Sequence, residues 1–255
     1  PSDAAQVMDL MQHLRLWKYA ECGYGENPHQ RAAHYRRSGE AVVLKPMRAT
    51  EQSLSYNNYS DADAALGLCN ELSRANTHQN CCVFIKHTNA CGAGVHSDPL
   101  ESYRRAYIGD PNAAMGGILA CGFPVTTTFA EAVMESFDRW GKALGAGGFF
   151  AEVWVAPSFD ELAVQLIRNH KKSWGAKVRL LTVGDDMTAA PDPNELDYRK
   201  IAGGMLVQTA DNVGLNEDQW KVVTKRAPTE SEISDLRLAW LIAKHTKSNA
   251  ISICK

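Results

Sequence analysis

Apolar and polar positions alternate along the chain with two periodicities, which predict strands and helices in alternation. A continuous apolar run is typical of a strand buried on both faces, and one occurs at 81–85. Further strands are predicted at 116–122, 152–157 and 177–183. Apolar residues on one face of a helical repeat predict helices at 2–17, 60–73, from 97 onward, 127–144, 158–172 and 230–246. This order predicts an α/β fold with three α/β/α layers and a mixed, largely parallel sheet.

Polar residues at the expected helix starts support this reading. The predicted caps are Ser2, Ser60 with Asp61 and Asp63 behind it, Pro99 in a first turn, and the capping boxes Ser158/Glu161 and Thr229/Glu232.

A change in composition divides the chain into two parts. Residues 1–183 carry the α/β pattern, whereas the acidic, proline-containing stretch 184–198 reads as a linker. The second part, 184–255, contains a strand-like run at 204–209 and the helix from 230. The apolar run 249–254 predicts a final strand at the edge of a sheet whose next strand is missing.

Composition narrows the functional classes. The 255 residues suffice for one large domain or two small ones, and a net charge of −2 argues against nucleic acid and anionic membranes as partners. None of the seven cysteines forms a Cys-x-x-Cys motif. We therefore expect reduced cysteines in a cytoplasmic protein with no membrane segment.

Lys86 and His87 follow directly on the apolar run 83–85, before the turn-rich residues 88–94. Side chains alternate along a strand, so both reach one site only if the strand ends there and the backbone bends. In open α/β sheets, ligands bind beyond the carboxyl ends of strands. The position therefore suits chemistry, although a surface lysine beside a hydrogen-bonded histidine is the plain alternative.

Five ordered segments resemble the family of formyltransferases that act on aminoimidazole carboxamide ribonucleotide (AICAR), usually fused to an IMP cyclohydrolase. They are YGENPHQ (24–30), IKHTNACG (85–92), GGILA (116–120) with EVWVAP (152–157), GGMLVQ (203–208), and the stretch from VVTKRAP to KSNAI (222–251). The resemblance implies a cytidine deaminase-like fold, and the zinc signature of the deaminases is absent. It also implies a homodimer with active sites at the subunit interface.

The family's reaction transfers a formyl group from 10-formyltetrahydrofolate to the 5-amino group of AICAR, with no metal in the chemistry. By resemblance, His87 is the general base and a substrate contact, and Lys86 stabilises the oxygen that becomes anionic. Ala90 stands where the family usually has proline.

The resemblance also implies substrate contacts at Gly23, Tyr24, Gly116, Glu152 and Asn249. Gly23 occupies a position where the family has an arginine that binds phosphate, which puts the substrate affinity in question. The plain alternatives are close packing for Gly116, an exposed carboxylate for Glu152 and a turn residue for Asn249.

Two other functions stay open. One is a catalytically incomplete, nucleotide-binding homologue or fragment, which Gly23 favours. The other is a hydrolase that uses the thiol of Cys91 near His87.

Overall fold

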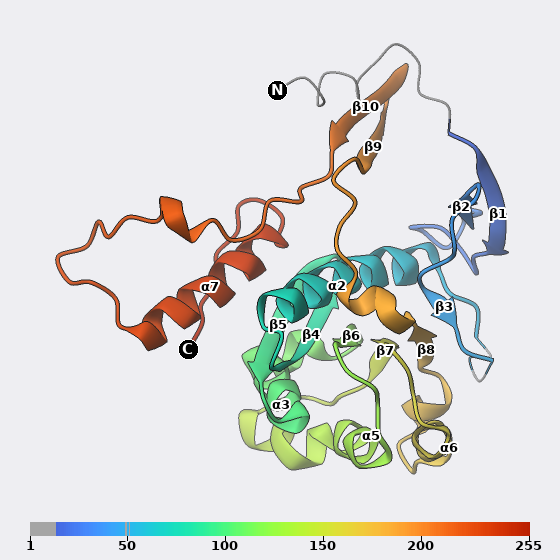
Figure 1. Ribbon diagram of the computed structural model, residues 1–255. Helices are drawn as coiled ribbons and strands as arrows, with labels where there is room; N and C mark the ends of the chain where they lie inside the picture. The colour runs from blue at the N-terminus through green and yellow to red at the C-terminus, as the bar shows by residue number, and fades with distance from the viewer. Residues whose placement is uncertain (1–13, 49, 51) are drawn as a thin grey trace.

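The computed structural model describes residues 14–48, 50 and 52–255. Its centre is a six-stranded sheet in the order β3-β8-β7-β6-β4-β5, covered by helices on both faces (Figure 1). The strands are β3 Lys45–Pro46, β4 Asn80–Lys86, β5 Asn89–His96, β6 Gly117–Cys121, β7 Ala151–Ala156 and β8 Arg179–Thr182. The mixed sheet and the three-layer α/β arrangement are as predicted; the cytidine deaminase-like label stays a prediction.

Parallel pairing is confined to the middle of the sheet. The pairs β6–β7 and β7–β8 are parallel, whereas β3–β8, β4–β5 and β4–β6 are antiparallel. As a result, the carboxyl end of β4 lies beside the amino ends of β6, β7 and β8.

The sheet separates two hydrophobic cores, because alternate side chains of each strand face opposite ways. On one face, Val83 and Ile85 pack against the buried Ala65 and Leu68 of helix α2. On the other face, α3, α5 and α6 cover the sheet, and their side chains pack on strand residues such as Phe84 and Trp154 (Figure 1). Both faces are apolar, which explains why these strands read as unbroken apolar runs.

The helices largely follow the predicted pattern, with different ends. They are α2 Tyr56–Ala75, α3 Pro99–Gly109, α4 Pro111–Ala114, α5 Thr127–Met134, α6 Glu161–Asn169 and α7 Glu230–Lys244. The predicted helix 127–144 leaves α-helical geometry after Met134 and continues as a π-helical turn, Phe137–Gly141, and a 3₁₀ turn, Lys142–Leu144. Three further 3₁₀ turns span Ser173–Ala176, Gly184–Thr188 and Glu217–Gln219.

Of the predicted helix starts within the described residues, two are wrong and two are confirmed; Pro99 stands in the first turn of α3 as expected. Helix α2 is capped by Ser55 instead of Ser60, since the Ser55 hydroxyl accepts from Asn58 N and the Asn58 side chain accepts from Ser55 N. Helix α6 begins after Asp160 without a side-chain cap, so the Ser158 box is absent. The Thr229/Glu232 box of α7 is confirmed.

Two hairpins stand apart from the central sheet. Strands β1 (Leu16–Glu21) and β2 (Ala33–Arg37) form one, and β9 (Leu196–Ile201) and β10 (Gly204–Thr209) form the other (Figure 1). Strand β10 matches the predicted run 204–209, whereas β9 was assigned to no element.

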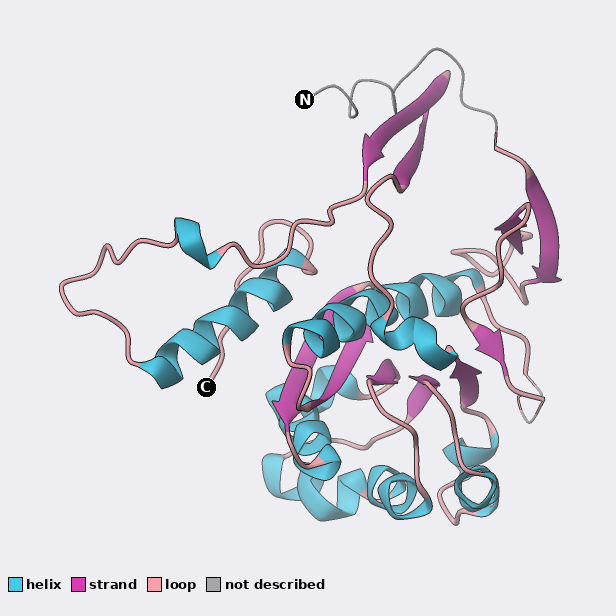
Figure 2. Ribbon diagram, viewed as in Figure 1, coloured by secondary structure: helices cyan, strands magenta, loops and turns pink. Residues whose placement is uncertain are grey.

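The two ends of the described chain differ from expectation. Most of the helix predicted over 2–17 lies outside the described residues, and its last part is wrong because Leu16 begins strand β1. The strand predicted over 249–254 is also wrong, because that segment is a loop with Ile251 and Ile253 88% and 93% exposed (Figure 2). Among the described residues, no helix is both long and apolar enough to cross a membrane.

Candidate functional site

His87 and Thr88 form a two-residue turn between β4 and β5. Lys86 pairs with Asn89 across the hairpin, and the two residues between them have φ angles of 54° and 60°. Hairpin turns with two positive φ angles usually contain Asn-Gly, since other residues meet steric resistance there. The predicted end of the strand and bend of the backbone are therefore confirmed, in a strained form that places the His87 side chain on the surface.

Asp61 of helix α2 forms hydrogen bonds to the backbone of this turn. Its Oδ2 accepts from the backbone N–H of His87 at 3.1 Å, and its Oδ1 accepts from the N–H of Thr88 at 2.8 Å. A carboxylate forms stronger hydrogen bonds than a neutral acceptor, which helps to offset the strain of the turn.

Lys86 is directed toward the start of the neighbouring strand β6. Its Nζ donates to the carbonyl oxygen of Met115 at 2.8 Å, one residue before Gly116. An ammonium group has three donors, so this bond leaves two for another acceptor.

Gly116 has a conformation that needs glycine. Its φ is +74°, and a Cβ at this position would lie 3.0 Å from Cζ of Phe150. Its N–H donates to the carbonyl of Phe150 at 2.8 Å. The backbone here therefore lies close to the segment that leads into β7 and Glu152.

Glu152 forms an ion pair with Arg179 instead of standing free. Arg179 Nη1 donates to Glu152 Oε2 at 2.7 Å, and its Nε donates to the carbonyl of Ser53 at 3.0 Å. The next residue, Leu54, accepts from the N–H of Gly23 at 2.9 Å. Arg179 thus connects Glu152 with the segment that holds Gly23.

Tyr24 extends this connection to helix α2. Its carbonyl accepts from the N–H of Tyr56, the first residue of α2, at 3.0 Å, and its side chain is 42% exposed. A Cβ on Gly23 would lie 2.8 Å from Oγ of Ser53, an exposed side chain that is free to rotate.

Asn249 lies in the loop after α7, and Asn89 ties this loop to the His87 turn. The N–H of Lys247 donates to Asn89 Oδ1 at 2.9 Å, while Asn89 Nδ2 donates to the carbonyl of His87 at 3.1 Å. Asn249 itself is exposed and accepts from the Ser248 hydroxyl at 2.9 Å.

A largely buried ion cluster fixes the end of α7 on α2. Glu71 accepts from Lys244 Nζ with both carboxylate oxygens at 3.0 Å and contacts His245 Nε2 at 2.6 Å. Burial by itself raises the pKa of Glu71, but the hydrogen bonds from His245 and Lys244 outweigh it, so the pKa lies below its ordinary value.

Three of the predicted residues lie at one end of the sheet, but on strands that run in opposite directions. Lys86 ends β4, whereas Gly116 precedes β6 and Glu152 lies at the beginning of β7. This end of the sheet contains the carboxyl end of β4 but the amino ends of β6 and β7, because β4 is antiparallel to β6 and β6 is parallel to β7.

The structure argues against the thiol hydrolase. Burial, with a smaller contribution from Asp110, raises the pKa of Cys91 to about 11, so the thiol stays protonated at neutral pH. In the described part of the chain, no group of three or more His, Cys, Asp or Glu side chains is arranged to hold a metal ion.

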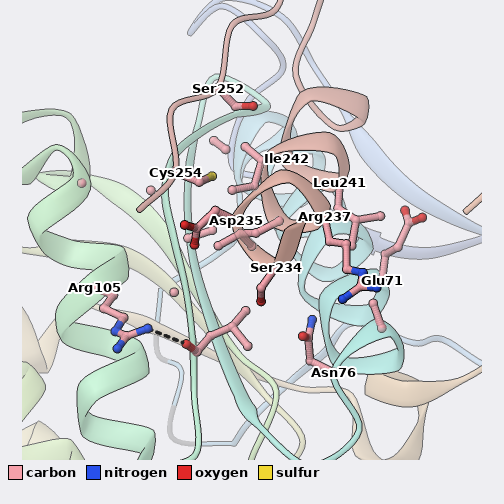
Figure 3. Close-up of a pocket in the computed structure, with 18 of the residues that line it drawn as sticks. Glu71, Asn76, Arg105, Ser234, Asp235, Arg237, Leu241, Ile242, Ser252 and Cys254 are labelled. Atoms are coloured by element: carbon pink, nitrogen blue, oxygen red, sulfur yellow. Dashed lines mark hydrogen bonds between the residues drawn. The ribbon is translucent and has the colours of Figure 1, made fainter. Parts of the chain in front are cut away.

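A pocket of about 950 Å³ lies elsewhere, between the outer strand β5, helix α7 and the C-terminal loop (Figure 3). Glu71, Arg105, Arg237 and Cys91 are among the residues that line it. The lining contains none of the residues expected to bind or convert the nucleotide, which are Gly23, Tyr24, Lys86, His87, Gly116, Glu152 and Asn249. We therefore place the candidate site at the end of the sheet and not in this pocket.

Three residues of the site were missed by sequence reasoning: Asp61, Asn89 and Arg179. Asp61 was noted only as an acidic residue near a helix start. Arg179 did carry a signal, since an arginine in an apolar strand needs a partner.

Fold and site together define an α/β protein with a lysine–histidine turn and a cluster of polar groups at one end of its sheet. Its sequence matches the family described as the AICARFT/IMPCHase bienzyme over residues 3–255. The chain belongs to this family.

Curated relatives agree with this assignment. The chain is 38% identical over 242 residues to the bifunctional purine biosynthesis protein PurH of Bacillus cytotoxicus, and 35% identical over 239 residues to that of a Thermoanaerobacter species. The PurH protein of Bacillus cereus is 37% identical over 240 residues. Each match covers 93% of this chain but 42% of the relative, so the chain spans about two fifths of their length.

Proposed function

We propose that this chain carries the base and part of the nucleotide site of an AICAR formyltransferase in purine biosynthesis. The observation that carries the proposal is the turn at the end of β4, which brings Lys86 and His87 to the end of the sheet where Gly116 and Glu152 also lie. Membership of the AICARFT/IMPCHase family supports AICAR as one substrate, and we propose 10-formyltetrahydrofolate as the formyl donor.

The chemistry assigns distinct roles to the two residues. The 5-amino nitrogen of AICAR attacks the formyl carbon, forming a C–N bond, while the carbonyl oxygen becomes anionic. His87 takes the amine proton, and the Lys86 ammonium stabilises the anionic oxygen. The bond from the formyl carbon to N10 of the folate then breaks, and N10 receives a proton, which gives formyl-AICAR and tetrahydrofolate.

The remaining residues hold the nucleotide. Gly116 lets the substrate approach the backbone, Glu152 faces the ribose hydroxyls, and Tyr24 and Asn249 complete the contacts. We further propose a cytoplasmic homodimer with active sites at the subunit interface, and no metal in the chemistry.

The test is formyl transfer by His87→Ala in the full-length protein, measured as release of tetrahydrofolate. We expect a loss of about 10²–10⁴-fold in kcat, with AICAR affinity within a factor of about three of the parent because a base contributes mainly to the transition state. His78→Ala is the matched control, since His78 is an exposed histidine in the turn before β4. Near-parental turnover by His87→Ala would reject the assignment.

Gly23 favours a second function, a nucleotide-binding protein without formyl transfer. A glycine offers no charge to a phosphate group. Thermal stabilisation by AICAR, together with no formyl transfer by the unaltered full-length protein, would select this alternative.

A further inference from the structure

The turn that carries His87 is held in an unfavourable conformation. Both of its residues have positive φ angles, and Thr88 is β-branched, which makes such a conformation especially uncommon. Glycine would adopt it without strain, but the proposed chemistry needs an imidazole at position 87. Something outside the turn must therefore stabilise it.

Asp61 is placed to supply that support. Its two carboxylate oxygens accept from the two consecutive backbone N–H groups of the turn at 3.1 and 2.8 Å. Helix α2 holds the backbone of Asp61 in place, because the neighbouring Ala62 and Ala65 are fully buried against the sheet.

We infer that Asp61 is a positioning residue for catalysis, which acts by fixing the His87–Thr88 turn and thereby the direction in which the imidazole leaves the backbone. The inference rests on the proposed function, since Asp61 acts only through His87. Asp61 binds backbone groups of the turn and takes no part in proton transfer.

A carboxylate is needed because each of its oxygens accepts one N–H. In Asp61→Asn, the amide keeps one acceptor oxygen, and its NH₂ group faces the second N–H, donor against donor. The substitution therefore removes one hydrogen bond of the pair and the negative charge, with almost no change in volume.

The first measurement is amide hydrogen exchange at His87 and Thr88 by NMR, which does not depend on catalysis. Asp61→Asn should speed exchange at these amides by about 10- to 100-fold, the factor expected for a lost hydrogen bond to a charged group. Asp63→Asn is the matched control on the same helix, because Asp63 lies near Glu195 and Asp197 instead of the turn. Unchanged exchange in Asp61→Asn would overturn the inference.

The second measurement is formyl transfer in the full-length protein. Asp61→Asn should lower kcat by about 10- to 100-fold, the scale of a misplaced catalytic group, and leave KM for AICAR within about threefold. Adding Thr88→Gly to Asp61→Asn should recover at least about half of the lost kcat on a logarithmic scale. Glycine adopts the conformation of the turn without support from the Asp61 carboxylate. A purely structural role of Asp61 in helix α2 predicts no such rescue.

If Asp61→Asn alone does not fold, the comparison is made in the Thr88→Gly background. The double variant should then turn over within about threefold of Thr88→Gly, and a deficit of tenfold or more would overturn the inference. His87→Ala in the same assay separates the two hypotheses: full turnover there rejects the proposed base, while the exchange data still decide whether Asp61 fixes the turn.

Discussion

Arg179 and Glu152 form an ion pair across the neighbouring strands β8 and β7, with 2.7 Å between Nη1 and Oε2. The Arg179 side chain is only 15% exposed. Its guanidinium also donates to the carbonyl of Ser53 and, at 3.3 Å, to Oε1 of Gln52. One side chain therefore joins the predicted ribose contact to the segment that holds Gly23.

Arg179→Lys should weaken AICAR binding by about tenfold, as expected for losing one charge-assisted hydrogen bond. A lysine keeps the charge, but a single ammonium does not reproduce the planar fork that reaches three acceptors. Titration calorimetry measures the affinity. Arg139→Lys is the control, because Arg139 pairs with Glu135 alone on a helical surface turn. Equal affinity in both variants would show that Arg179 does not organise the nucleotide site.

The central part of the fold could be predicted because its strands are buried on both faces. Such strands leave apolar runs, as in 81–85 and 153–157, which lie largely in β4 and β7. The first turn of α2 was missed because Tyr56 and Asn57 are exposed and do not belong to the apolar face of the helix. The helical repeat of buried apolar residues starts only at Ala62. The run 249–254 has strand-forming residues, but no strand of the described chain pairs with it, and β-propensity alone does not make a strand.

Gly116→Ala should destabilise the protein by about 1–2 kcal/mol, because a residue with a Cβ resists a φ of +74°. The new methyl group would also press on the ring of Phe150. Thermal or urea unfolding measures the change. Gly147→Ala is the control, since no atom in the described part of the chain lies within 4 Å of its Cβ position and its φ is not in the left-handed region. That variant should be neutral or slightly stabilised; equal destabilisation by both substitutions would contradict the argument.

The site could be predicted only in part. Lys86 and His87 stand out in sequence because they follow directly on an apolar run. Asp61, in contrast, lies 26 residues before His87 and acts on backbone groups, so no side-chain pattern links the two. The strained turn was equally hidden, since His-Thr is not a sequence that favours positive φ angles.

Glu71→Gln should destabilise the docking of α7 on α2 at neutral pH, by about 3 kcal/mol, because it removes the carboxylate that pairs with Lys244 and His245 in a largely buried place. Lys244 then keeps only the longer, more exposed contact with Asp211 at 4.0 Å among the described residues. Denaturant unfolding measures this loss. Glu135→Gln removes a more exposed ion pair and should cost less than about 1 kcal/mol.

The same cluster has a defined pH dependence. Burial raises the pKa of Glu71, but the bonds from His245 and Lys244 bring it below the ordinary 4.5. A carboxylate with a lowered pKa in the folded state stabilises the fold above its unfolded pKa, and this contribution disappears as the pH falls below 4.5 through the folded value. The difference between parent and Glu71→Gln should therefore shrink in acid; a difference that stays constant would refute the cluster's role.

Gly23→Arg should tighten AICAR binding, and it distinguishes the two proposed functions. If position 23 faces the phosphate, a guanidinium there adds a charge-assisted hydrogen bond of about 1.5–3 kcal/mol, or about 10- to 100-fold in Kd. The backbone accepts a side chain, because the φ of Gly23 is not in the left-handed region and only the exposed Ser53 hydroxyl must rotate away. Titration calorimetry gives the affinity.

A control must show whether any gain in AICAR affinity comes from a local contact at position 23 or from the added positive charge in general. Gly204→Arg is the matched control, because it adds the same charge on strand β10, where no atom of the described residues lies within 4 Å of the Cβ position. Phosphate recognition predicts tighter AICAR binding for Gly23→Arg alone, and the gain should be absent with the nucleoside that lacks the phosphate. Equal changes in AICAR affinity in both variants would mean that the segment around Gly23 does not face the phosphate. Tighter AICAR binding together with faster formyl transfer favours the enzyme, because more of the substrate is then bound beside His87. Tighter AICAR binding without any formyl transfer favours the nucleotide-binding protein.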